Sequence, residues 1–247
     1  ISLYTSTIVK QRAGKYIFFN YQEDTLKFLK NFKKNNFKNT ILLKDTSNSI
    51  VEKLSETLDI NFINISLIDY SSSYEKLISE KLLLNESNKR KKLLSYTIST
   101  ELGFIPRRRN DIDSIIIFSS IDKMKAIKPA ISYNFSEDLD IFYINTDKLN
   151  YQFNYNDKDF DGMTMIDFPF NIIHDGRKEI STNRNLLFSI GYDAYEIYLL
   201  TNDPTTKSYY NYSGLTGNFY IRNTKEIKRE SPIISIKNGK IKPVNYP

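Results

Sequence analysis

The chain has 247 residues, of which 40% are apolar and 26% charged, so it can form a hydrophobic core and an intrinsically disordered protein is excluded. Lys and Arg outnumber Asp and Glu by 35 to 29 without a basic tail, so nucleic acid is not an expected partner. Cysteine is absent, which excludes disulfides, thiolate nucleophiles and cysteine-ligated metals within this sequence. The longest apolar runs, such as Ile115–Phe118, are too short to span a bilayer.

Strands and helices are predicted to alternate through the first part of the chain. Short apolar runs predict strands at Ile1–Val9, Tyr16–Phe19, Thr40–Leu43, Asn61–Ile65, Ser114–Phe118 and Asp140–Ile144. Apolar residues at helical spacing predict helices that begin at Asp24 and Ile50, and helices over Tyr74–Leu102 and Ile121–Phe135. Buried strands separated by amphipathic helices are typical of an α/β fold with a Rossmann-like parallel sheet flanked by helices.

Three local features modify these predicted helices. We expect the helix over Tyr74–Leu102 to break at Asn85–Asn88 and to be closed by Gly103. Pro129 is expected to bend the helix over Ile121–Phe135 or to end it early.

After Asn145 the pattern changes. A loop over Asp157–Met165 leads into a short strand, and two hairpin-like segments are predicted at Leu215–Arg222 and Ile233–Val244, the second with a type I′ turn at Asn238-Gly239. A helix is predicted over Asn183–Thr201. Its inward-facing residues are expected to be Leu186, Leu187, Ile190, Ala194, Ile197 and Tyr198.

No catalytic constellation emerges from the sequence. His174 is the only histidine and has no Gly-x-Ser-x-Gly motif beside it, so we interpret it as a surface residue. Gly214-Leu215-Thr216-Gly217 lacks the Lys of a phosphate loop and is interpreted as a tight turn. Arg107-Arg108-Arg109 could bind a phosphate or carboxylate, but pairing with Asp111 and Asp113 is favoured. We therefore expect no enzyme and no cofactor.

The segment Asp157–Gly162 matches the first half of a calcium-binding EF-hand loop. The position that must supply the bidentate glutamate is Phe168, and Gly162 leads into a strand instead of a helix. The segment is therefore interpreted as a solvated acidic turn, and no metal site is expected.

Four motifs in order along the chain, together with Glu23-Asp24 after an apolar strand, resemble one known family. The motif positions are Arg107, Arg108, Asp111, Asp113, Lys128 and Pro129; Asp161 and Gly162, followed by Asp167-Phe168-Pro169; Gly191 and Asp193; and Gly214, Gly217 and Arg222. The chain resembles the LppC/LpoA family of penicillin-binding protein activators, which are outer-membrane lipoproteins.

The resemblance implies a type I periplasmic-binding-protein-like fold with C-terminal hairpins. Residues 1–247 would form a single domain of this kind, with the core of the second lobe at about 20–150 and the remainder of the first lobe and the crossovers at 1–15 and 180–247. The N-terminal part of the full protein and its lipidated cysteine are expected to lie outside this chain.

The family resemblance also implies that the protein is a non-catalytic activator of a peptidoglycan synthase. The partner would be a class A penicillin-binding protein, a bifunctional peptidoglycan synthase, met on the periplasmic side of the outer membrane of a Gram-negative bacterium. Membrane contact would occur only through the lipid anchor. The alternative is a periplasmic binding protein for an amino-acid-like small ligand. Its candidate cleft lies at the carboxyl ends of the predicted strands, at Asp45, Ser119, Ser120 and Asn145.

Overall fold

The structure, a computed structural model, describes residues 2–4, 16–18, 24–25, 27–29, 37–44, 61–66, 73–134, 138–146, 157–173, 186–202, 209–222 and 226–244. The chain divides into two units, which are considered separately. Unit 1 comprises residues 1–31, 148–156 and 165–247, and unit 2 comprises residues 32–147 and 157–164.

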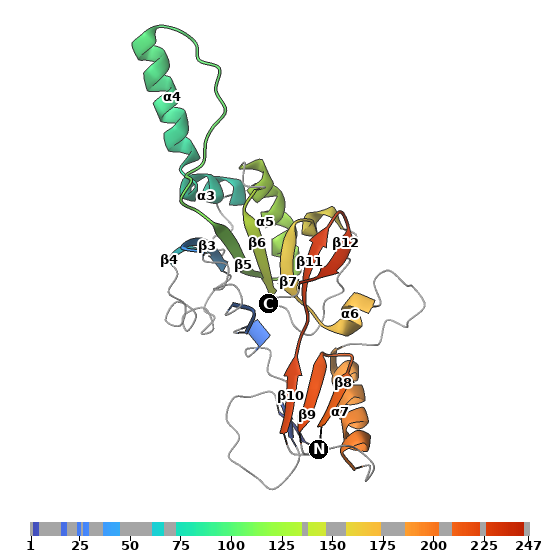
Figure 1. Ribbon diagram of the computed structural model, residues 1–247. Coiled ribbons are helices and arrows are strands. Elements are labelled where there is room, and N and C mark those ends of the chain that lie inside the picture. The colour runs from blue at the N-terminus through green and yellow to red at the C-terminus, as the bar shows by residue number, and fades with distance from the viewer. Residues whose placement is uncertain are drawn as a thin grey trace. The chain divides into compact units, whose positions relative to one another are not determined.

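The described elements begin with the strands β1 to β4, continue with interspersed helices and strands as far as α7, and end with the strands β8 to β12 (Figure 1). The strands are β1 (Ser2–Tyr4), β2 (Tyr16–Phe18), β3 (Asn39–Lys44), β4 (Asn61–Ser66), β5 (Ser114–Ser119), β6 (Asp140–Asn145), β7 (Met163–Ile166), β8 (Tyr209–Ser213), β9 (Asn218–Arg222), β10 (Glu226–Glu230), β11 (Ile233–Lys237) and β12 (Lys240–Pro243). The helices are α3 (Tyr74–Lys81), α4 (Leu84–Ile98), α5 (Ile121–Tyr133), the 3-10 helix η1 (Lys158–Phe160), α6 (Pro169–Ile173) and α7 (Leu186–Asn202).

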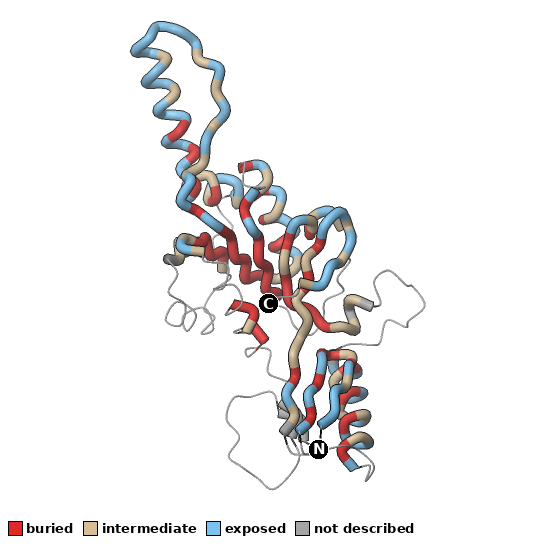
Figure 2. The backbone as a smooth tube through the Cα atoms, in the orientation of Figure 1, coloured by how far each residue is buried: buried red, intermediate tan, exposed pale blue. Residues whose placement is uncertain are grey.

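Unit 2 is built on parallel strands in the order β4-β3-β5-β6. Ile41 of β3 lies opposite Ile115 of β5, and Ile116 lies opposite Phe142 of β6. All six residues of β5 are buried, and the buried residues run in continuous lines along the strands of this unit (Figure 2). A strand that is apolar on both faces requires cover on both faces, so the predicted α/β arrangement of this unit is confirmed.

Helix α5 packs on β5 through one apolar side, yet it contains a proline. Met124, Ile127 and Ile131 are fully buried on this side. The helix continues past Pro129 to Tyr133, so Pro129 does not end it, and the alternative that it bends the helix stays a prediction. Proline removes one backbone hydrogen bond, and the burial of Ile131 on the next turn offsets that loss.

The predicted long helix is divided, but not where the sequence suggested. The break lies at Leu83, which adopts a left-handed φ of 57°, whereas Asn85–Asn88 continue within α4. The helix then ends at Ile98, where Ser99 takes a φ of 51°, instead of at Gly103. Burial of Leu82 at 0% exposure fixes the first change of direction, because the chain must turn for this side chain to reach the core.

Unit 1 contains a three-stranded antiparallel sheet in the order β10-β9-β8, with α7 lying against it (Figure 1). The shared core consists of Ile197 from the helix and Phe219 and Ile221 from β9, with Tyr212 packed against them. Tyr212 and Phe219 stack with ring centroids 5.8 Å apart. The hairpin predicted at Leu215–Arg222 is corrected: β9 begins at Asn218 and pairs with β8, which the sequence did not predict.

The inward face of α7 also differs from the prediction. Leu187 and Tyr198 are 65% and 49% exposed, so their predicted inward orientation is wrong. The buried positions of the helix are four residues apart and are mostly polar: Ser189, Asp193, Ile197 and Thr201. The helical spacing of apolar residues predicted the helix. It did not predict which face is buried, because most residues on the buried face are polar.

The last hairpin of unit 1 confirms its prediction. Strands β11 and β12 pair through a turn at Asn238 and Gly239, whose φ values are 54° and 65°. Positive φ at both central residues defines the type I′ turn, which these two residue types favour. Across the described parts of both units, no helix is both long and apolar enough to cross a membrane.

Candidate functional site

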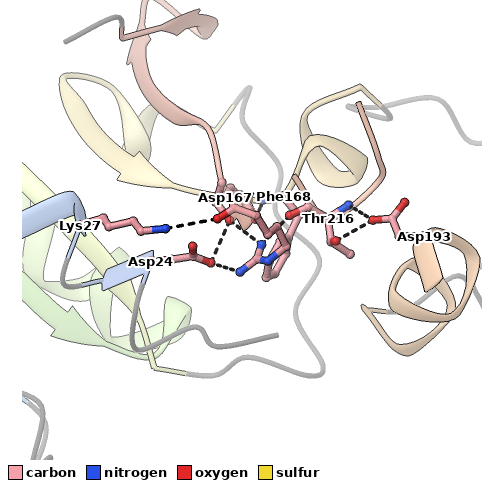
Figure 3. A network of polar contacts seen from close by, with 8 residues as sticks. Asp24, Lys27, Asp167, Phe168, Asp193 and Thr216 are labelled. Carbon is pink, nitrogen blue, oxygen red and sulfur yellow. Dashed lines mark hydrogen bonds and ion pairs between the residues drawn. The ribbon is translucent and has the colours of Figure 1, made fainter. Parts of the chain in front are cut away.

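Asp193 lies on the buried face of α7 and binds the turn between β8 and β9 (Figure 3). Its carboxylate accepts hydrogen bonds from the backbone N–H of Leu215 at 2.8 Å and of Thr216 at 2.7 Å. The hydroxyl of Thr216 donates to it at 2.6 Å, and that of Tyr212 at 3.3 Å. A buried carboxylate needs such donors, so these hydrogen bonds hold the turn against the helix.

Two glycines of this turn provide the space that the arrangement needs. A Cβ atom on Gly214 would lie 2.6 Å from a carboxylate oxygen of Asp193. A Cβ atom on Gly217 would lie 2.6 Å from the carbonyl oxygen of Glu230. The N–H of Gly214 donates to the carbonyl of Gly217 at 2.9 Å and closes the turn. Glycine is therefore required at both positions by close approach of other atoms.

A buried ion pair continues the network from this turn. The guanidinium of Arg229 donates to the carbonyl of Thr216 at 2.7 Å and to the hydroxyl of Ser231 at 2.8 Å, and it pairs with the carboxylate of Asp24. The side chains of the pair are 4% and 3% exposed. The Ser231 hydroxyl also donates to Asp24 at 3.0 Å, and Lys27 donates to the carbonyl of Arg229 at 3.3 Å.

Burial dominates the electrostatics of this network. It raises the pKa of Asp24 above its ordinary value, although Arg229 and Ser231 act in the opposite direction. Burial also raises the pKa of the Tyr212 phenol, and the adjacent carboxylate of Asp193 adds to that effect. The raised pKa keeps Tyr212 in the protonated form that donates to Asp193.

A small open cavity adjoins the ion pair within unit 1. Its volume is about 310 Å³, and Asp24, Lys27, Phe28, Lys228, Ser231 and Ile233 are among its lining residues. The cavity is small for a ligand site of drug-sized molecules. The buried carboxylate of Asp24 is already bound by Arg229 and Ser231, so it is engaged in holding the fold.

The remaining motif positions of unit 1 lie around this network. The N–H of Phe168 donates to the carboxylate of Asp167 at 2.7 Å, and the N–H of Phe170 in α6 donates to the carbonyl of Leu215 at 2.9 Å. Gly191 is exposed on α7, with open space around it. The guanidinium of Arg222 lies 4.9 Å from the centroid of the Tyr209 ring, a cation–π contact at the sheet surface.

The arginine- and aspartate-rich motif of unit 2 organises the entry to β5. Arg109 pairs with Asp111, as expected, with an N–O distance of 2.5 Å. Arg108 instead pairs with Asp138 at 2.5 Å. Asp113 accepts hydrogen bonds from the backbone N–H groups of residues 38 and 39, at 2.7 and 2.9 Å, so its expected pairing with arginine is corrected. The side chain of Arg107 is exposed.

The other motif positions of unit 2 lie on α5 and at the turn before β7. Lys128 reaches the hydroxyl of Ser132 at 3.5 Å, and Pro129 is exposed. Gly162 has a φ of 79°, a left-handed conformation that favours glycine, where the chain turns into β7.

Lys125 and the loop backbone bind Asp157, the first residue of the acidic turn that resembles part of a calcium loop. The carboxylate of Asp157 binds Lys125 at 2.9 Å, which lowers the pKa of that carboxyl, and it also accepts from the backbone N–H of Asp159. Among the described residues, no three His, Cys, Asp or Glu side chains are grouped so as to hold a metal ion. His174 lies outside the described residues.

The candidate cleft of unit 2 can be examined at three of its four positions, since Asp45 lies outside the described residues. The hydroxyl of Ser119 donates to the carbonyl of Ser120 at 3.1 Å. Tyr143 donates to the carbonyl of Ser119 at 3.1 Å and to the side-chain oxygen of Asn145 at 3.3 Å. The structure thus brings Ser119 and Asn145 together, but their polar groups bind Tyr143 and the adjacent backbone.

Neither Asp24 nor Arg229 was predicted to belong to a functional site. Asp24 was predicted only to begin a helix after an apolar strand, and no element was predicted for the strand that begins at residue 226. One signal was present: Ile227 and Arg229 are two residues apart in a strand, so they share a face. An arginine on the inward face of a strand requires a buried anion, but the sequence does not indicate which one.

Comparison with known proteins identifies the family. Residues 34–239 match the family described as "LppC putative lipoprotein". No curated protein matches the sequence.

Solved structures are similar in fold at low sequence identity. Full-length LpoA from Haemophilus influenzae has a TM-score of 0.57 at 15% identity, covering 98% of this chain and 43% of that chain. The LpoA (YraM) C-domain from the same organism, described as a regulator of PBP1A, has a TM-score of 0.53 at 14% identity, covering 98% and 74%. A "putative branched-chain amino acid ABC transporter" from Chromobacterium violaceum has a TM-score of 0.55 at 10% identity, covering 94% and 71%.

These likenesses confirm the predicted periplasmic-binding-protein-like α/β fold. The chain spans less than half the length of full-length LpoA. Because the family match extends over residues 34–239, which is most of the sequence, the chain belongs to the LppC family.

Proposed function

We propose that this chain is a non-catalytic activator of a class A penicillin-binding protein and acts by protein–protein contact in the periplasm. Membership of the LppC family over residues 34–239 is the observation that carries the proposal. The likeness to an LpoA C-domain described as a regulator of PBP1A supports the class of partner. The lipoprotein description of the family supports a lipid anchor, outside this chain, on the periplasmic side of the outer membrane.

The contacts of the family motifs are consistent with a structural role. In unit 1, Asp193 receives several hydrogen bonds from the turn that contains Gly214. In unit 2, Asp113 receives backbone hydrogen bonds. A carboxylate occupied in this way holds elements together and is poorly placed to act as a general base.

The proposed mechanism is a shift in conformational population. An activator that binds one state of the synthase more tightly increases the population of that state, and it needs no chemistry of its own. We also propose that the core of the second lobe lies at about 20–150 and that residues 1–15 and 180–247 belong to the first lobe and the crossovers.

Calorimetry with the class A penicillin-binding protein of the same organism tests this function. We expect saturable binding of the chain and faster transpeptidation on lipid II in its presence. If neither the chain nor the intact lipoprotein binds the synthase, the likeness to regulators is one of fold alone.

The alternative function, binding of an amino-acid-like ligand, is supported by the likeness to the Chromobacterium violaceum protein. Ser119 and Asn145 lie at the strand ends where such ligands bind in α/β folds. A thermal-shift screen of free amino acids separates the two functions. A ligand at 100 times its Kd stabilises the folded state by about 2.7 kcal/mol, whereas an activator without a small ligand shows no shift.

A further inference from the structure

A helical arm projects from unit 2 and is held only at its base. Helix α4 and the segment 99–109 that returns from it extend away from the sheet of the same unit (Figure 1), and residues 84–109 are called the basic arm. Of the 15 residues of α4, only Leu84 and Ser87, in its first turn, are buried. At the base, the N–H of Arg107 donates to the hydroxyl of Ser87 at 3.1 Å. The rest of the arm is surface.

The basic arm carries nearly all of the net charge of the chain. It contains seven Lys and Arg residues and two Glu residues, so it accounts for five of the six net positive charges. The remainder of the chain is therefore almost balanced. A positive charge concentrated on one projecting element favours contact with an anionic partner.

Some of these cations are held by neighbours. Those with a described partner are Lys89 beside Glu86, Lys91 over the ring of Phe104, Arg108 beside Asp138 and Arg109 beside Asp111. Arg90, Lys92 and Arg107 form no ion pair with any residue that the structure describes. These three charges are available to a partner.

The arm is also apolar at its surface. Five large apolar side chains on it are between 51% and 86% exposed beyond the buried base: Leu93, Leu94, Tyr96, Ile98 and Ile105. A helix of this length with so little burial is marginal in isolation, so contact with a partner would stabilise it. Clustered exposed apolar residues with adjacent cations are typical of protein interfaces.

An open groove of about 1200 Å³ runs beside α4 and defines the contact surface. Lys92 and Tyr96 line it four residues apart and so share one face of the helix. Glu80, Glu86 and Glu101 also line it beside Lys89 and Lys91, so the excess positive charge belongs to the arm as a whole and not to the groove alone. We propose that the basic arm, on the face that carries Lys92 and Tyr96, is the docking site for an acidic, partly apolar segment of the partner protein. This inference rests on the proposed function, since the partner is the class A penicillin-binding protein.

The end of the arm disfavours insertion into a bilayer interior. Beyond Ile98 the chain continues through Ser99, Thr100 and Glu101, all of them exposed. A bilayer interior would leave these polar groups and the last carbonyls of the helix without hydrogen-bond partners. A protein surface can supply those partners.

Calorimetry with matched variants of the intact chain tests the docking site. Lys92→Glu and Tyr96→Ala alter exposed groove residues, whereas Lys240→Glu and Tyr133→Ala make the same changes on β12 and α5. We expect each arm variant to weaken binding of the synthase about tenfold or more, and each control to stay within about twofold. Circular dichroism confirms that all variants are folded.

The remaining outcomes separate the two proposals. If the unaltered chain binds and the arm variants bind equally well, the docking site is wrong and the activator function stands. If the unaltered chain does not bind, the docking site is wrong, and the activator function is also wrong when the intact lipoprotein fails to bind. If the arm variants lose binding to phosphatidylglycerol vesicles but retain the synthase, the arm contacts lipid and the docking proposal is overturned.

Discussion

The sheet of unit 2 and the core of unit 1 are stabilised by different kinds of interaction. Strand β5 is buried throughout and largely aliphatic, and the charges of unit 2 pair near the surface, as Lys125 does with Asp157. In unit 1, Asp24, Asp193 and Arg229 are buried at the centre of the packing. An apolar core tolerates similar apolar residues, whereas a buried charge depends on one particular partner, so single-atom changes should affect unit 1 more.

The largest effect is expected from Asp24→Asn. It leaves the buried guanidinium of Arg229 without a counter-charge, which should lower the free energy of unfolding by about 3–5 kcal/mol. Urea unfolding followed by circular dichroism measures this loss. Replacing both partners, as Asp24→Leu with Arg229→Met, should recover most of it, because no charge is then buried alone. A double variant as unstable as the single one would contradict this account.

A somewhat smaller loss is expected from Asp193→Ala. The change removes the acceptor of two backbone N–H groups and of the Thr216 hydroxyl, and should cost about 3 kcal/mol. Amide hydrogen exchange at residues 215 and 216 provides the local measurement. Unchanged protection of these two amides would show that water or another group replaces the carboxylate.

Gly214→Ala tests whether residues 214 and 193 are energetically coupled. The added Cβ would lie 2.6 Å from the Asp193 carboxylate, and such overpacking costs about 1–3 kcal/mol. In the Asp193→Ala background the space is free, so the same change should cost less. A double-mutant cycle measures this difference, and strictly additive losses would show that the two residues do not interact.

The smallest effect is expected at the surface of unit 2. Lys125 lowers the folded-state pKa of Asp157, so the stability from this pair is present above the ordinary pKa of an aspartate and is lost as pH falls through the folded value. The contribution should be below about 1 kcal/mol because the pair is partly exposed. Asp157→Asn should remove this part of the acid dependence in urea titrations, and Asp140→Asn, at an exposed position of the same unit, provides a control.

The parts of the fold that could be predicted are those that apolar periodicity determines. Strands β3, β5 and β6 follow from continuous apolar runs, and the last hairpin follows from Asn238-Gly239. The end of α4 could not be predicted. Ser99 adopts the left-handed conformation that glycine usually provides, so Gly103 drew the predicted boundary too far.

The candidate site was predictable only in part. Asp193, Gly214 and Gly217 came from the family resemblance, and their packing explains why these residue types occur together. The pairing of Asp24 with Arg229 joins positions 205 residues apart, and no local pattern carries that information. Which distant charges pair with one another is therefore known only from the structure.

The same separation affects how the chain folds. Unit 2 is nearly continuous in sequence, whereas unit 1 combines residues 1–31 with residues 165–247. During synthesis, most of unit 2 can collapse while Asp24 still has no counter-ion, because Arg229 has not yet left the ribosome. Closing so long a loop is entropically slow, so we expect unit 1 to complete its core last. Until then Asp24 has no counter-ion, and this interval is when holding chaperones would be needed.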